Sequence, residues 1–182
     1  MKKTVFAFAV LLLLLAVSCA TRSVQPEETF VIYEGVFIDN VNEVFNLAAE
    51  LRGGKAPLQN VKDEFHVTVA YLPESPLTEK YGAKVTVRVT AYDREKMLLE
   101  DGKEVESEAM SVVLVTSDEV LDKYIADNLE STPHITLSYT NAPKDSMNID
   151  FGDAKEISFD ITGTFGAYVK NVGYIFSPEL AP

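Results

Sequence analysis

The chain has 182 residues, of which 47% are apolar and 24% are charged, and its formal net charge is −12. This length and composition indicate one globular domain and argue against a disordered chain. Sixteen basic against 28 acidic residues argue against a broad basic face that coats long nucleic acid, but they allow a small anionic ligand at one local site. One cysteine and two histidines exclude a disulfide framework, a thiolate metal cluster and a His-rich metal site within one chain.

The first residues have the pattern of a targeting segment. Lys2 and Lys3 form a short positive region, and residues 5–17 form an unbroken apolar run of thirteen. That length fits the apolar part of a signal peptide and is short for a membrane-spanning helix. The only cysteine, Cys19, falls where cleavage is expected, so the segment 1–18 resembles a bacterial lipoprotein signal peptide with Cys19 as the lipidated residue. The alternative is an ordinary secretory signal with an incidental cysteine.

Cleavage at this point would leave a mature chain of residues 19–182. Loss of Lys2 and Lys3 takes the formal charge from −12 to −14. Residues 19–29 would be the lipidated N-terminus and a flexible polar tether. We therefore expect the domain to be lipid-anchored to the cell envelope on the extracytoplasmic side, periplasmic or surface-exposed. Ala20, in place of an inner-membrane-retaining aspartate, points weakly to the outer membrane.

Residues 30–182 are typical of a single α+β domain. Segments rich in β-branched and aromatic residues predict strands over 30–38, 65–71, 84–92, 111–116, 133–139, 157–161 and 172–176. Two amphipathic stretches predict helices, one over 41–52 with Asn40 as its cap and Gly53 as its stop, and one ending near Leu129 that begins with a capping box from Thr116 to Glu119. Asp101-Gly102 predicts a hairpin over 97–106.

One short strand sequence occurs twice. FHVTVAY at 65–71 aligns with PHITLSY at 133–139, and the histidine, threonine and tyrosine positions are identical. Each copy follows a predicted helix, and the two copies lie 68 residues apart, from His66 to His134. The repeat is consistent with a duplicated domain in which each half carries one histidine.

Alternation along a strand assigns the side chains of each copy to two faces. His66 and Thr68 share one face, as do His134, Thr136 and Ser138. The opposite, core-facing side is expected to carry the apolar and tyrosine positions of both copies, namely Val67, Val69, Tyr71, Ile135, Leu137 and Tyr139. Each strand would then present a histidine beside a hydroxyl on its polar face.

The two H-x-T motifs, His66-Val67-Thr68 and His134-Ile135-Thr136, resemble those of the 2H phosphoesterase superfamily, whose members include 2′,3′-cyclic nucleotide phosphodiesterases and 2′-5′ RNA ligase-like proteins. Ser146, with Pro143, is similar to the tRNA-ligase type of that family. The resemblance implies a pseudo-symmetric two-lobed α+β fold with antiparallel sheets, a central cleft and outer helices. It also implies a metal-independent hydrolase with no cofactor, which acts on a small cyclic or 2′-5′-linked nucleotide.

The chemistry of these residue types agrees with that resemblance. Opening a cyclic phosphate needs one group to take a proton from water and another to protonate the departing ribose oxygen. Histidine can do either near neutral pH, so His66 and His134 are the candidate catalytic pair, in an order that the sequence leaves open. Thr68 and Thr136 can donate hydrogen bonds to the non-bridging phosphate oxygens.

Several further residues are candidate substrate contacts: Ser138, Ser146, Lys55 and Lys170. The acidic residues Glu104, Glu106 and Glu108 are expected to be solvated loop charges rather than metal ligands. The expected partners are a small nucleotide or phosphate ester and, through the lipid, a membrane; long nucleic acid is not expected. We expect the chain to be a monomer.

Two alternatives to an enzyme remain. No arginine or lysine stands out beside either motif, which favours a binding module that has the same fold, has lost catalysis and holds a nucleotide or another anion. The second alternative is a structural or adhesive envelope lipoprotein, in which the repeated strand only records an old duplication.

Overall fold

The computed structural model describes residues 29–182. The predicted signal peptide, Cys19 and the tether up to residue 28 lie outside the described residues. Among the described residues, no helix is both long enough and apolar enough to cross a membrane.

The described chain is an α+β domain, as the sequence predicts. Its strands are β1 (Val31–Ile38), β2 (Asn60–Val61), β3 (His66–Tyr71), β4 (Lys84–Leu98), β5 (Glu104–Val115), β6 (His134–Tyr139), β7 (Lys155–Val169) and β8 (Gly173–Ile175). Its α-helices are α2 (Val41–Arg52) and α3 (Glu119–Asn128), and its short 3-10 helices are η1 (Thr78–Lys80), η2 (Pro143–Asn148), η3 (Phe151–Asp153) and η4 (Pro178–Leu180). The hairpin predicted at Asp101-Gly102 joins β4 to β5, and both strands are longer than expected.

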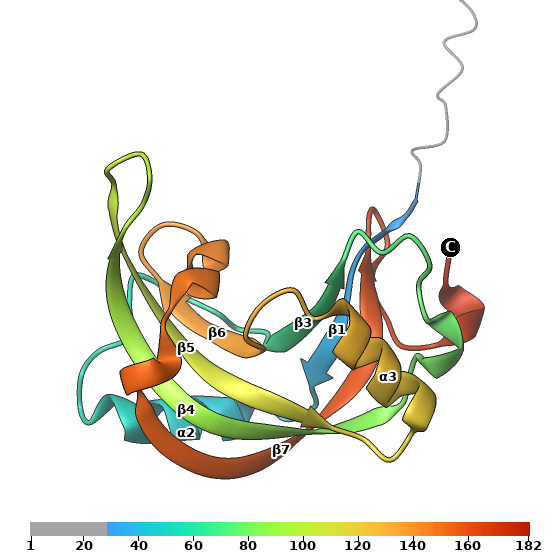
Figure 1. The fold of residues 1–182 in the computed structure, drawn as a ribbon, viewed down its shortest axis with the longest axis horizontal. Coiled ribbons are helices and arrows are strands. Elements are labelled where there is room, and N and C mark those ends of the chain that lie inside the picture. Colours follow the sequence, from blue (N-terminus) through green and yellow to red (C-terminus); the bar gives the residue numbers. More distant parts are fainter. Residues whose placement is uncertain (1–28) are drawn as a thin grey trace, which may run out of the picture.

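All the strands belong to one antiparallel sheet with the order β2-β6-β5-β4-β7-β1-β3, and β8 pairs with β7. The long strands β4, β5 and β7 bend strongly, so the sheet curls and brings β6 next to β3 (Figure 1). Residues 62–65 alone connect β2, at one end of the strand order, to β3, at the other. Because four residues span only a short distance, the two ends of the sheet must lie close together.

The order of elements repeats along the chain. The series β1-α2-β3-β4 is followed by the equivalent series β5-α3-β6-β7, if the two-residue β2 is set aside. The last strand of each series pairs with the first strand of the other, because β4 pairs with β5 and β7 pairs with β1. The two halves of the chain therefore share one sheet and exchange strands across its centre.

The helices end close to where the sequence predicts, but the capping hydrogen bonds differ from those predicted. α2 ends at Gly53, which adopts the left-handed conformation expected of a helix stop. Asn40 occupies the first cap position, yet its side chain donates to Glu43 and makes no cap hydrogen bond. The predicted capping box from Thr116 is wrong, because Asp118 caps α3 by accepting from the backbone N–H groups of the first turn.

A buried ion pair joins four elements beneath the second half of the sheet. Glu108 is fully buried on β5, which corrects the expectation of solvated loop charges there. Its carboxylate accepts two hydrogen bonds from Arg52 at the end of α2, at 2.7 and 3.0 Å. It also accepts from the hydroxyl of Tyr92 on β4, at 2.7 Å, and from that of Ser138 on β6. Four donors thus compensate the desolvation of one carboxylate.

The first half of the chain has a matching buried carboxylate. Glu34 on β1 is fully buried and accepts from the Tyr124 hydroxyl of α3 and from the backbone N–H of Leu77, the latter at 2.8 Å. Burial, the largest effect, raises the pKa of Glu34. Glu34 pairs with the fifth residue of β3, as Glu108 pairs with the fifth residue of β6. In both halves the carboxylate is therefore bound by a residue from the helix of the other half.

Replacement of Glu108 by alanine should destabilise the domain by about 3–5 kcal/mol, because the Arg52 guanidinium would stay buried without its partner. Chemical denaturation of the purified protein would measure this loss. The double variant Arg52→Met/Glu108→Leu removes both charges and should lose much less. A double variant as unstable as Glu108→Ala would show that packing volume, rather than the unpaired charge, sets the cost.

Candidate functional site

The two strands that carry the H-x-T motifs lie side by side without pairing. Cα atoms of β3 and β6 approach within 8 Å, and Figure 1 shows the two strands next to each other, where the two ends of the curled sheet come together. The backbone N–H of Lys62 donates to the carbonyl of Leu137 on β6, at 2.9 Å, just before the chain enters β3. His66 and His134 each begin their strand.

Both motif strands have the same bulge. His66 and Thr68 pair with Phe37 and Gly35, but the next pair is Ala70 with Glu34, so Val69 has no partner on β1. On β6, Thr136 pairs with Ala109 and Ser138 with Glu108, so Leu137 has no partner on β5. The extra residue stands three positions after the histidine in both strands. This repeated irregularity makes the two strands equivalent in local geometry, beyond their similar sequences.

The bulge reverses the alternation of side chains beyond it, and this overturns two expectations. Tyr71, predicted to face the core, is 63% exposed. Ser138, predicted to share the polar face of His134, is fully buried, accepts from the Leu58 backbone N–H at 3.1 Å and donates to Glu108. Tyr139, also expected in the core, is half-buried. Before the bulge, the assignment of His66, Thr68, His134 and Thr136 to a face apart from the buried Val67 and Ile135 holds.

Aromatic rings surround the first histidine. The His66 ring stacks on that of Tyr33, with centroids 4.9 Å apart, and lies 5.7 Å from the ring of Phe37. Tyr168 and Tyr174 continue this group, at 5.5 Å from Tyr33 and 5.1 Å from Phe37 respectively. Burial among these rings is the largest cause that lowers the pKa of His66, to about 4. His66 is therefore neutral at neutral pH.

Two positive or titratable groups near His66 lower its pKa further. They are the ammonium of Lys62 and the imidazole of His134, whose charges disfavour a second positive charge on the ring. This coupling indicates that the two histidines lie within electrostatic reach of each other. The sequence analysis missed Lys62, although it stands four residues before His66 and is the nearest preceding cation.

The second histidine is hydrogen-bonded at both ring nitrogens. The Nδ1 atom of His134 lies 2.9 Å from the carbonyl oxygen of Thr132, and Nε2 lies 3.0 Å from the Ser146 hydroxyl. That hydroxyl also lies 2.7 Å from the Thr136 hydroxyl and 2.7 Å from the carbonyl oxygen of Pro143. Burial lowers the pKa of His134, and the bond to Thr132 opposes this effect. The sequence candidate Ser146 is thus in direct contact with both polar residues of the second motif.

This network accommodates both protonation states of His134. A carbonyl only accepts, so Nδ1 carries a proton and donates to Thr132. In the neutral ring, Nε2 then accepts from the Ser146 hydroxyl. In the imidazolium, Nε2–H donates to the Ser146 oxygen while the serine proton turns to Pro143. The Thr136 hydroxyl can donate to Ser146 in either state, so no donor loses its partner when His134 gains or loses a proton.

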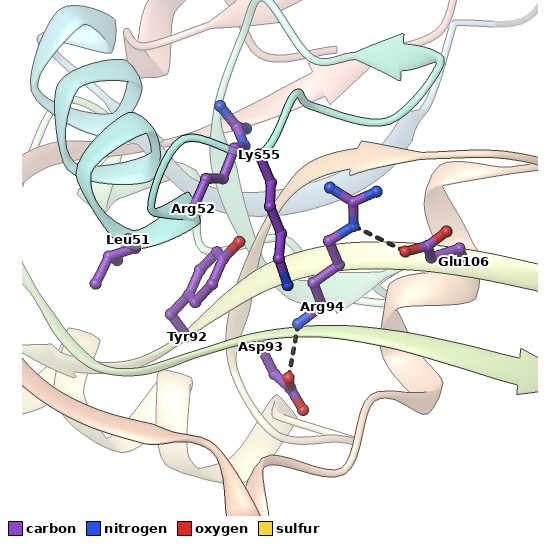
Figure 2. A pocket seen from close by; sticks show the side chains of 7 residues that line it. All are labelled: Leu51, Arg52, Lys55, Tyr92, Asp93, Arg94 and Glu106. Carbon is purple, nitrogen blue, oxygen red and sulfur yellow. Dashed lines mark hydrogen bonds and ion pairs between the residues drawn. The ribbon is translucent and has the colours of Figure 1, made fainter.

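The other sequence candidates lie apart from the histidines. Lys170 follows β7, with its ammonium 5.2 Å from the centroid of the Phe30 ring, at the opposite end of β1 from Phe37. Lys55 lines a cavity of about 270 Å³ at the end of α2, together with Arg52 and Arg94 (Figure 2). The structure therefore groups Thr68, Thr136 and Ser146 with the histidine strands but gives Lys55 and Lys170 other surroundings.

The chain has no match among protein-family models, curated proteins or solved structures. Within residues 29–182, no three or more His, Cys, Asp or Glu side chains come together in a way that could hold a metal ion.

Replacement of Lys62 by glutamine should raise the pKa of His66 from about 4, because the repelling ammonium is removed while burial among the rings persists. NMR titration of the His66 ring protons would measure the change. Lys62→Arg keeps the charge and should keep the low pKa. An unchanged titration in Lys62→Gln would contradict an electrostatic contact between this residue and His66.

Proposed function

We propose that this protein is a phosphoesterase of the 2H type, which opens a small 2′,3′-cyclic or 2′-5′-linked nucleotide without a metal ion. The observation that carries the proposal is the matched placement of His66-x-Thr68 and His134-x-Thr136. Each motif begins a strand, each strand has a bulge three residues after the histidine, and the two strands lie side by side. On this proposal the repeated element series is the two-lobed fold of that superfamily.

In the proposed reaction, water attacks phosphorus and the bond from phosphorus to one ribose oxygen breaks. One histidine takes the proton of the water and the other protonates the departing oxygen, so the product is a phosphomonoester with a free hydroxyl. His66 suits the base, because its lowered pKa keeps it neutral. His134 suits the acid, because the carbonyl of Thr132 and the hydroxyl of Ser146 both accept from its charged form.

The threonine hydroxyls are the proposed donors to the phosphate. Thr68 is exposed and available to a ligand, whereas Thr136 bonds to the Ser146 hydroxyl. The oxygen of Ser146 is shared between His134 Nε2 and Thr136, at 3.0 and 2.7 Å. A phosphate oxygen bound between the same two groups would make similar hydrogen bonds, so we infer that substrate displaces this hydroxyl.

The aromatic residues beside His66 support a nucleotide as the substrate. Tyr174 and Phe176 are 40% and 41% exposed, and both contact Phe37, whose ring in turn lies beside that of His66. A planar base can stack on such rings while its phosphate lies at the histidines. The predicted lipid at Cys19 would hold the enzyme on the extracytoplasmic side of a membrane.

Binding without catalysis is the second candidate function, and one observation favours it. Ser146 is almost fully buried, and its hydroxyl already bonds to both polar side chains of the second motif, His134 and Thr136. If η2 never releases this contact, the site would hold an anion without hydrolysing it. Calorimetry that shows tight binding of a 2′,3′-cyclic nucleotide without turnover would select this function over the first.

The enzyme proposal predicts hydrolysis of a 2′,3′-cyclic nucleotide in excess chelator. Each of His66→Ala and His134→Ala should lower kcat/KM by about 10²–10⁴-fold, because each removes one proton-transfer group. The pH profile should be bell-shaped, with His66 on the acidic limb and His134 on the basic limb. Lys170→Ala, outside the site, is the matched control and should keep full activity. Full activity in either histidine variant would overturn the proposal.

Ser146→Ala should move the basic limb of that profile to lower pH. The variant removes the bond that Ser146 makes to either form of His134, and because the bond to the charged form is the stronger one, the ring loses its proton more easily. Ser146→Thr keeps the hydroxyl and should leave the limb in place. NMR titration of His134 gives the same comparison independently of activity. An unchanged limb and an unchanged titration in Ser146→Ala would contradict a contribution of this hydroxyl to the protonation of His134.

A further inference from the structure

We propose that the cavity at the C-terminal end of α2 is a second binding site, which takes an oxyanion such as a phosphate monoester or a carboxylate. The cavity has a volume of about 270 Å³ and lies between the end of α2, the following turn and strands β4 and β5. Lys55 extends into it between Tyr92 and Arg94 (Figure 2).

Hydrogen bonds and ion pairs hold the cationic side chains in the wall of the cavity. Arg52 is held by the fully buried Glu108, and the Tyr92 hydroxyl bonds to the same carboxylate. Arg94 donates from Nε to Glu106, at 2.8 Å, and from Nη1 to the carbonyl oxygen of Ala56, at 2.7 Å. The position of the Arg94 guanidinium is thus determined before any ligand arrives, which reduces the entropy that binding would cost.

Two cationic groups at this cavity keep donors available. The bonds of Arg94 leave its Nη2 group unused, and Lys55 takes part in none of the ion pairs among residues 29–182. Of the two lining carboxylates, Glu106 accepts from Arg94 Nε, and one oxygen of Asp93 accepts from the Arg94 backbone N–H at 2.7 Å. Lys55 and the Nη2 group of Arg94 therefore offer a ligand N–H donors on two cations, which suit an oxyanion.

The cavity is separate from the histidine site. One link to the motif strand is Glu108, which accepts from Ser138, and Ser138 lies four residues, or about 13 Å of strand, from His134. Because the bulge at Leu137 turns Ser138 away from the face of His134, this link runs through the core rather than along the site. A ligand at Lys55 would not touch the catalytic pair.

The test is titration of the full-length isotope-labelled chain with inorganic phosphate and, in a second arm, with acetate, observed by NMR. Shifts should appear at the backbone amides of residues 51–55 and 92–94. Lys55→Gln and Arg94→Gln should each weaken the affinity at those amides by about tenfold or more, since each removes a charged hydrogen bond. Lys123→Gln makes the same charge change on α3, where Lys123 is paired with Asp127, and should leave the affinity unchanged.

The outcomes separate this site from the proposed enzymatic one. His66→Ala should keep the shifts at residues 51–55 and 92–94, whether or not the chain hydrolyses nucleotides. Shifts confined to the motif strands would overturn the second site and leave the phosphoesterase proposal intact. Equal affinity in Lys55→Gln and the unsubstituted chain would also overturn it. Binding of either probe that depends on Lys55 and Arg94 supports it and identifies the preferred oxyanion.

Discussion

The fold depends on the burial of one carboxylate in each half. Glu108 has no exposed surface, and a carboxylate in such a place costs several kcal/mol unless it is fully hydrogen-bonded. Its donors come from the end of α2 and from β4 and β6, so these elements can come together in only one arrangement. Glu34 is buried in the same way, and its hydrogen-bond donors come from α3 and from the turn before η1. Each helix is therefore fixed to the strands of the opposite half, and neither half can satisfy its carboxylate alone.

The bulges in β3 and β6 are related to the same buried carboxylates. They also determine which side chains of each motif strand share a face. Each carboxylate stands opposite the residue just beyond an extra residue, Val69 or Leu137. If β6 continued without the extra residue, Ser138 would alternate onto the polar face with His134 and could not donate to Glu108. The bulge changes the face on which the following side chain lies. One short strand can therefore carry a histidine and a threonine on one face and, beyond the bulge, a residue that faces the buried carboxylate on the other.

Most of the elements and both motifs could be predicted from the sequence, because they rest on local patterns of apolar and turn residues. The faces of Tyr71 and Ser138 could not, since simple alternation contains no information about an extra residue in the register. Glu108 was also mistaken for a solvated charge. Its neighbours Glu104 and Glu106 give β5 a polar start typical of a loop, and its partner Arg52 lies 56 residues away. Lys62 was missed for a similar reason, because the proximity of its ammonium to His66 depends on the path of the loop between β2 and β3.

The two motif strands differ in the residues that stand opposite them, and this difference gives the two histidines different surroundings. Phe37 stands opposite His66, and the equivalent position opposite His134 is Ser111. Tyr33 stands opposite Tyr71, whereas the equivalent residue opposite Tyr139 is Ser107. Burial among aromatic neighbours lowers the pKa of His66 to about 4, so His66 stays neutral. Smaller neighbours leave room for η2, whose Ser146 reaches His134 and accepts from it when charged. On the proposed function, two nearly identical motifs would therefore serve as base and acid without any difference in their own residues.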